Sequence, residues 1–150
     1  MPLTIHDPRI GLEHALLCHF FGTARWFEWE GALCAEIGLL TNSKTLYGIR
    51  FVLPIFYPDA MPEVLVTHPA PLCDNSFRSL AERGPDAAMH VLAGRGPFTS
   101  ICHYHPARWA ADMTLYKAAI KARVWLETYE IHRRTGRPIA TYLAHMKESP

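Results

Sequence analysis

The distribution of proline is the feature of this sequence that most constrains its fold. Of the twelve prolines in the 150-residue chain, eight lie between Pro54 and Pro106. Proline has no backbone N–H to donate and its ring clashes with a helical neighbour, so few residues of this stretch fit inside a helix or a central strand. We therefore expect a long irregular segment over 68–113, broken only by a helical turn near 76–82. Irregular segments of this length are typical of the functional part of a domain.

The residues before this segment predict one helix. It is expected to begin after Asp7, because aspartate caps a helix and a proline follows it, and to end before Gly22. Leu12, Leu16 and Phe20 recur at four-residue spacing within this range. This spacing is typical of a helix and supports its assignment to Pro8–Phe21.

Four runs rich in β-branched and aromatic residues follow the first helix and predict strands. The runs cover 25–30, 32–39, 46–53 and 63–66. Short connections join them, and one of these is a polar turn at 41–44. Consecutive strands with short connections predict an antiparallel meander.

Helical periodicity returns after the proline-rich segment. An apolar stripe that includes Trp125 runs from Thr114, a plausible cap, to Gly136, and predicts one long helix whose stripe must be buried. A shorter helix is expected after Pro138. Together the elements predict an α+β fold in a single domain that covers 1–150.

Composition excludes several classes of protein. Fifteen Lys and Arg against fourteen Asp and Glu leave no strong field toward phosphates, so nucleic acid is not expected as a partner. No apolar run is long enough to cross a bilayer, and charges in the first twenty residues are unlike a signal peptide. The four cysteines form no CxxC pair, which predicts neither a disulfide framework nor a zinc ribbon. A cytoplasmic protein with no membrane partner is expected.

A series of motifs resembles the ubiquitin-conjugating enzymes. Residues 46–64 (LYGIRFVLPIFYPDAMPEV) resemble the third strand of that family, its Tyr-Pro turn and the proline that opens its fourth strand. Residues 100–109 (SICHYHPARW) resemble the segment with the active-site cysteine and the tryptophan after it. Residues 113–115 (MTL) and 125–136 (WLETYEIHRRTG) resemble the start and end of a helix in bacterial members. The resemblance covers 24–136, and the order of the motifs makes it specific.

The resemblance implies a ubiquitin-conjugating-enzyme-like fold in which Cys102 is the nucleophile. Cys102 would accept the C-terminal carboxyl of a protein as a thioester from an activating enzyme and pass it to an amine. The activating enzyme would use the ATP, so no cofactor is expected here. Bacterial proteins of this kind look like components of anti-phage operons, among them CBASS systems. The implied partners are therefore an activating enzyme and a ubiquitin-like protein or a cGAS-like nucleotidyltransferase.

The sequence departs from the family upstream of the cysteine. Eukaryotic members have a His-Pro-Asn tripeptide there, whereas this chain has His90-Val-Leu twelve residues before Cys102. The oxyanion role usually assigned to the asparagine is thus unfilled or met by another group. His90, His103 and His105 are the candidate supporting residues, because an imidazole can stabilise a thiolate or move a proton.

Two further functions remain open. A non-catalytic module of the same fold would bind a partner's C-terminal tail, and the missing asparagine supports this alternative. A cysteine hydrolase would pair Cys102 with His90 or His105, and would need a positioned third residue that the sequence does not reveal.

A zinc site at the same segment is the competing interpretation, since thiolate and imidazole are preferred zinc ligands. In an extended segment His103 and His105 share one face while Cys102 points to the other, so too few ligands converge. The remaining ligands would have to come from His90, His68 or Cys73, and we expect no metal. The other cysteines, Cys18, Cys34 and Cys73, are interpreted as core or turn residues.

Overall fold

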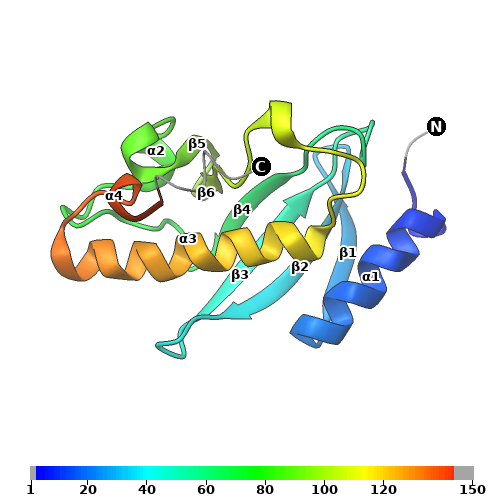
Figure 1. Cartoon of the computed structure of the whole chain (residues 1–150), viewed down its shortest axis with the longest axis horizontal. Helices are drawn as coiled ribbons and strands as arrows, with labels where there is room; N and C mark the ends of the chain where they lie inside the picture. Colours follow the sequence, from blue (N-terminus) through cyan, green and yellow to red (C-terminus); the bar gives the residue numbers. More distant parts are fainter. Residues whose placement is uncertain (1–2, 144–150) are drawn as a thin grey trace.

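The computed structural model describes residues 3–143. It has an α+β architecture, in which a twisted antiparallel sheet is crossed on one side by α3, with α1 beside that helix (Figure 1). No helix within residues 3–143 is long and apolar enough to span a membrane. In chain order, the elements are α1 (Pro8–Phe21), β1 (Ala24–Trp29), β2 (Ala32–Leu40), β3 (Leu46–Val52), β4 (Glu63–His68), α2 (Leu80–Arg83), the 3-10 turn η1 (Ala87–Met89), β5 (Val91–Arg95), β6 (Phe98–Ile101), the 3-10 turn η2 (Pro106–Arg108), α3 (Leu115–Thr135) and α4 (Ala140–Leu143).

The sheet has six strands in the order β1-β2-β3-β4-β6-β5, and every neighbouring pair is antiparallel. The first four follow one another along the chain, so the predicted meander is confirmed. Their inner face packs with α1 and α3 into the main core. The other face carries a smaller apolar cluster around Cys34, Val52 and Leu65.

The prediction of a four-stranded sheet and an irregular segment over 68–113 is wrong in part. β5 and β6 form a hairpin there, and β6 extends the sheet by pairing with β4, with Ser100 opposite Leu65. The strands are five and four residues long, too short to show a period. Pro85 and Pro97 lie outside both strands, so neither interrupts the hydrogen-bonded ladder.

The short helix α2 lies in this region too, slightly beyond the turn predicted at 76–82. Ser79 caps it by accepting a hydrogen bond from the backbone N–H of Glu82. α2 packs against β5, and Gly94 allows the close approach, since a Cβ at that position would lie 2.6 Å from the carbonyl oxygen of Ala81. The helix thereby covers the outer strand of the sheet.

The bounds predicted for α1 are confirmed, but the apolar residues whose spacing indicated the helix are not the ones that it buries. The side chains that α1 buries are Ile10, Glu13 and Leu17, whereas Leu12 and Phe20 are 52% and 49% exposed. The buried face contains a carboxylate, and a search for apolar spacing cannot select such a face. The apolar residues at four-residue spacing therefore lie toward solvent.

The buried Glu13 carboxyl joins three parts of the chain. Its Oε2 accepts hydrogen bonds from the backbone N–H of Leu115 (3.0 Å) and from the hydroxyl of Tyr57, and the guanidinium Nε of Arg9 lies 3.9 Å away. Burial raises the pKa of Glu13 above its usual range, despite these opposing contacts. α1, the start of α3 and the Tyr57 turn are thus held together by one group.

We expect Glu13 to contribute a loss of stability as pH rises above 4.5, the ordinary pKa of this carboxyl. Up to the raised pKa of the folded state, folded Glu13 keeps a proton that the unfolded chain has released, which costs up to about 1.4 kcal/mol of folding free energy per pH unit. Glu13→Gln removes this dependence. Urea unfolding would be measured for both proteins between pH 4 and pH 8. The unfolding free energy of E13Q should rise relative to that of the wild type as pH rises. A difference that does not change with pH would contradict the assignment.

The long helix α3 is confirmed as one unbroken helix. The Thr114 side chain caps its first turn, and Gly136 ends it with a φ of 76°. Trp125 is 1% exposed, stacks on Tyr129 with ring centroids 5.4 Å apart, and donates from Nε1 to the carbonyl of Met89 at 3.0 Å. That hydrogen bond ties the helix to the turn that leads into β5.

A short helix after Pro138 is also confirmed, as α4. Ile139 and Leu143 are buried in the main core. Met146, predicted to continue the same apolar face, lies outside the described residues.

Candidate active site

Cys102 directly follows β6, and the pairing of the hairpin sets what faces it. Val91 of β5 pairs with Ile101 of β6, so the next pair along the ladder places His90 opposite Cys102. The backbone N–H of Cys102 donates to the carbonyl of His90 at 2.9 Å, which continues the ladder by one step. The nucleophile candidate and one candidate histidine are therefore held together by the sheet.

His90 is presented by a short loop that is fixed at both ends. Asp86 and Val91 close its base with two backbone hydrogen bonds of 3.0 and 3.2 Å. The indole of Trp125 holds the carbonyl of Met89, immediately before His90. His90 has the left-handed conformation (φ 50°, ψ 47°), which residues with side chains seldom adopt. Such conformations are kept where surrounding contacts enforce them, commonly at functional sites.

Two cavities meet at Cys102. The larger, of about 570 Å³, extends toward residues 105–108, and the smaller, of about 260 Å³, extends toward residues 85–87. Cys102, His90 and Leu92 line both. Cys102 is half-buried. Cys102 therefore lies in the wall that the two cavities share.

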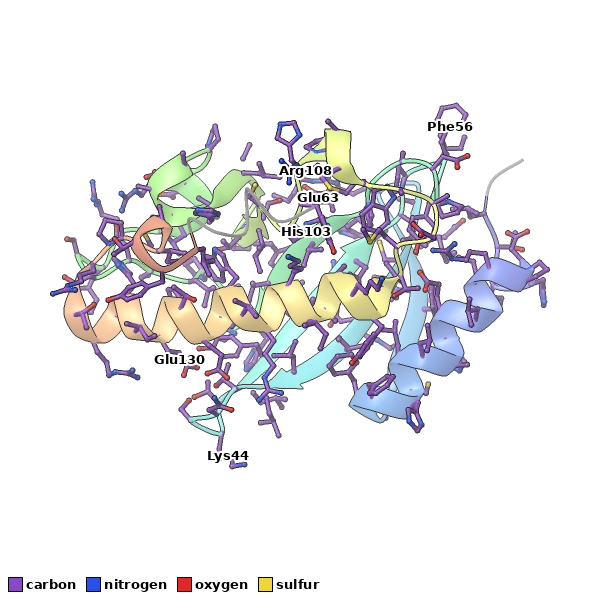
Figure 2. The ribbon with its side chains drawn as sticks, viewed as in Figure 1. Lys44, Phe56, Glu63, His103, Arg108 and Glu130 are labelled. Carbon is purple, nitrogen blue, oxygen red and sulfur yellow. The ribbon has the colours of Figure 1, made fainter. Side chains whose placement is uncertain are left out.

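His103 points into the core beside α3 (Figure 2). It is 4% exposed, its Nδ1 lies 3.4 Å from the carbonyl of Ile101, and its ring meets the edges of Tyr104 and Trp109. Burial lowers the pKa of His103 to about 4, so the imidazole is neutral near pH 7. It supports the site by packing and does not supply a charge.

His105 is exposed and caps η2, where its Nδ1 accepts from the backbone N–H of Ala107 at 3.2 Å. The prediction that His103 and His105 share a face is wrong, because the chain leaves the extended conformation at this point. His105 borders the larger cavity only. Of the three candidate histidines, His90 is the one that faces Cys102 across the ladder.

The charges around the two cavities differ. Among the described lining residues, the larger cavity has the guanidinium of Arg108 and no carboxylate, whereas the smaller has Asp86. Although burial opposes it, hydrogen bonds from Arg83 and from the N–H of Ala88 lower the pKa of Asp86. Burial also raises the pKa of Tyr104. The carboxylate of Asp86 is also paired with the guanidinium of Arg83, which offsets its charge.

Sequence reasoning missed Asp86, Arg108 and the hydrogen bond from Trp125 to the carbonyl of Met89. Pro85-Asp86 is the kind of pair that opens a helical turn, so the cap at Asp86 had a local signal. The other two had none, because their roles depend on contacts across the sequence.

Within residues 3–143, no three His, Cys, Asp or Glu side chains lie where they could share a metal ion. Cys73 lines a separate cavity beside α2, together with Arg78 and Ser79. Cys73, one of the ligands that the competing zinc interpretation would need, thus does not line the cavities at Cys102.

The remaining cysteines occupy different surroundings. Cys18 on α1 is half-buried, with its Sγ 3.5 Å from Nε2 of His14, and Cys73 is half-buried as well. Cys34 is 0% exposed, and burial raises the pKa of its thiol to about 11. None of the three lines the cavities at Cys102.

This contrast predicts selective alkylation. At pH 7 a thiol with a pKa of 11 is about one part in ten thousand thiolate, and only the thiolate reacts. We expect iodoacetamide to modify Cys102 at least about a hundredfold faster than Cys34 in the folded protein. Peptide mapping after timed labelling would measure both rates. Equal rates in folded protein, or a Cys102 that reacts only after denaturation, would show that the site is closed.

Comparison with known proteins finds no match to a family model, to a curated protein or to a solved structure. The chemistry of Cys102 must therefore be inferred from its surroundings and from the motifs in residues 46–136.

Proposed function

We propose that this protein is a ubiquitin-conjugating-like acyl transferase. In this proposal Cys102 accepts the C-terminal carboxyl of another protein as a thioester and passes it to an amine. The observation that carries the proposal is the position of Cys102, half-buried at the end of β6 and lining two cavities. A thioester carrier needs a thiol that substrates can reach from two sides and a rigid wall that holds it during attack.

The contacts between distant motifs support the same proposal. Tyr57 and Trp109 come from the two segments that resemble the family, and their ring centroids lie 6.4 Å apart. Nε1 of Trp109 donates to the carbonyl of Pro58 at 2.7 Å. We therefore propose a ubiquitin-conjugating-enzyme-like fold with the β5–β6 hairpin placed before the active-site segment.

The proposed partners follow from the resemblance to bacterial members of the family. They are an activating enzyme and a donor protein, either ubiquitin-like or a cGAS-like nucleotidyltransferase, in a cytoplasmic anti-phage (CBASS) system. The larger cavity supports a donor tail there, because it is the roomier of the two cavities that Cys102 lines. The modified amine would approach from the side of Asp86.

The test is to incubate the protein with ATP and the products of neighbouring genes that resemble an activating enzyme and a donor. We expect an adduct that survives denaturation and is cleaved by a thiol reductant, because thiolate exchanges with a thioester but not with an amide. Denaturing gels with and without reductant would show it. An adduct that resists reductant in the wild type would contradict the proposal.

A binding module of the same fold is the second candidate. The larger cavity favours it, since Met61, Leu92 and Tyr104 offer apolar surface to a tail whether or not chemistry follows. In that case Cys102→Ala should leave both partner affinity and biological function unchanged. Calorimetric titration of the variant with the donor protein, beside a phage-protection assay, separates the two candidates.

A further inference from the structure

We infer that His90 carries the proton in the reaction at Cys102. The inference rests on the proposed transfer function and goes further, because it assigns the proton transfer of that reaction to one imidazole. Three observations carry it: the register that sets His90 opposite Cys102, the burial of His90 at the junction of the two cavities, and its enforced left-handed backbone.

The register brings the two backbones together. The N–H of Cys102 donates to the carbonyl of His90 at 2.9 Å, and a hydrogen-bonded antiparallel pair has Cα atoms about 5.5 Å apart. Both residues also line the same two cavities. At this separation an imidazole can reach the sulfur of Cys102, directly or through one intervening atom of the substrate.

His90 is buried where the two cavities meet. His90 is 4% exposed and borders both cavities, so it meets whatever occupies either one. The other titratable side chains that line these cavities are Asp86, His103, Tyr104, His105 and Arg108. The pKa of Asp86 lies below its usual range, and His103 is neutral near pH 7. His105 lines the larger cavity alone and is used as a cap.

The proton balance of the transfer step defines the role. The amine nitrogen attacks the thioester carbonyl, an N–C bond forms, the C–S bond breaks, and Cys102 leaves as a thiolate. The amine must lose one proton, and the thiol must finally gain one. Neutral His90 takes the proton from the attacking nitrogen and delivers it to the sulfur of Cys102, so no external acid, base or oxidant is needed.

His90→Asn is the decisive variant. Asparagine tolerates the left-handed conformation and donates hydrogen bonds as the family's asparagine does, but it cannot carry a proton. The probe is a synthetic peptide that ends in Gly-Gly and is supplied as its mercaptoethanesulfonate thioester, which loads Cys102 by thiol exchange. Free lysine then serves as the amine. Intact-mass measurement follows loading and discharge separately.

We expect H90N to load with the peptide. Its discharge to lysine should be about a hundredfold or more slower than that of the wild type, because the general base is missing. The wild-type discharge rate should show a titration that H90N lacks, and added imidazole should restore part of the H90N rate. His90→Gln repeats the test without mimicking the asparagine. His19→Asn, an exposed histidine on α1, is the matched control, and thermal unfolding verifies that each variant is folded.

The outcomes separate this inference from the proposed function. If wild-type protein loads and discharges but H90N matches it in rate and pH profile, the proton role is wrong and the transferase proposal stands. If the wild type does not load, the pH profile of iodoacetamide alkylation decides. If the pH midpoint of Cys102 alkylation differs between H90N and the wild type, the His90–Cys102 pair is supported without the transferase. If the midpoint is the same in both proteins, the pair is rejected.

Discussion

Replacing Cys102 with alanine is expected to abolish the adduct, and replacing it with serine is expected to leave an adduct that no longer yields to reductant. Alanine has no nucleophile. Serine offers a hydroxyl that forms an oxygen ester, which thiolate does not exchange under the same conditions. The protein would be incubated with ATP, activating enzyme and donor, and resolved on denaturing gels with and without reductant. Intact mass would identify the bond.

Cys73→Ser is the matched control for these variants. Cys73 is also half-buried and also borders a cavity, but its cavity lies beside α2. It should form the reductant-labile adduct in wild-type amount. A C102A protein that still forms the adduct would place the nucleophile elsewhere in the chain.

Removal of the Trp125 side chain is expected to be the most destabilising single change in α3. Trp125→Ala deletes a residue that is 1% exposed and stacked on Tyr129, which costs about 3–5 kcal/mol of unfolding free energy. It also takes the hydrogen-bond donor from the carbonyl of Met89. Urea unfolding, monitored by far-UV circular dichroism because the variant removes a tryptophan, would measure the loss.

Two variants separate packing from the hydrogen bond. Trp125→Phe keeps an aromatic ring beside Tyr129 but loses the donor, and should cost about 1–3 kcal/mol. Met89 directly precedes His90, so loss of this hydrogen bond should loosen the loop that presents His90. W125F should therefore also slow the proposed discharge of the Cys102 thioester to an amine. Phe56→Ala is the exposed control, since Phe56 is 73% exposed and protrudes from the molecule (Figure 2), and a change within about 0.5 kcal/mol is expected. A W125A loss no larger than that would contradict the packing role.

The sequence predicted where α1, α3 and the strands of the meander lie, but not every face that they bury. The inward residues of α3 and the meander are mostly apolar and form the main core, although α3 also buries Thr128 and His132. α1 differs, because Glu13 occupies the centre of its buried face. Apolar spacing therefore selected Leu12 and Phe20, and only the contacts of Glu13 with Tyr57 and Leu115 identify the true face.

The candidate site was predictable only in part, for a related reason. Cys102 was found through the motif around it. The position of His90 depends on the pairing of β5 with β6, two strands too short to have a detectable period. Twelve residues of separation in sequence become one step of a ladder, and no local pattern contains that information.

The packing of α2 on β5 limits how another chain can approach Cys102. β5 is the last strand on its side of the sheet, and an uncovered last strand invites strand addition by a foreign peptide or a second copy of the protein. Here the backbone of α2 near Ala81 lies so close to Gly94 that even a methyl group would not fit between them. The loop before β5 also occupies the outer edge of this strand, because the N–H and the carbonyl of Val91 are both hydrogen-bonded to the backbone of Asp86. Strand addition at this point, one ladder step from Cys102, is therefore blocked by the chain itself.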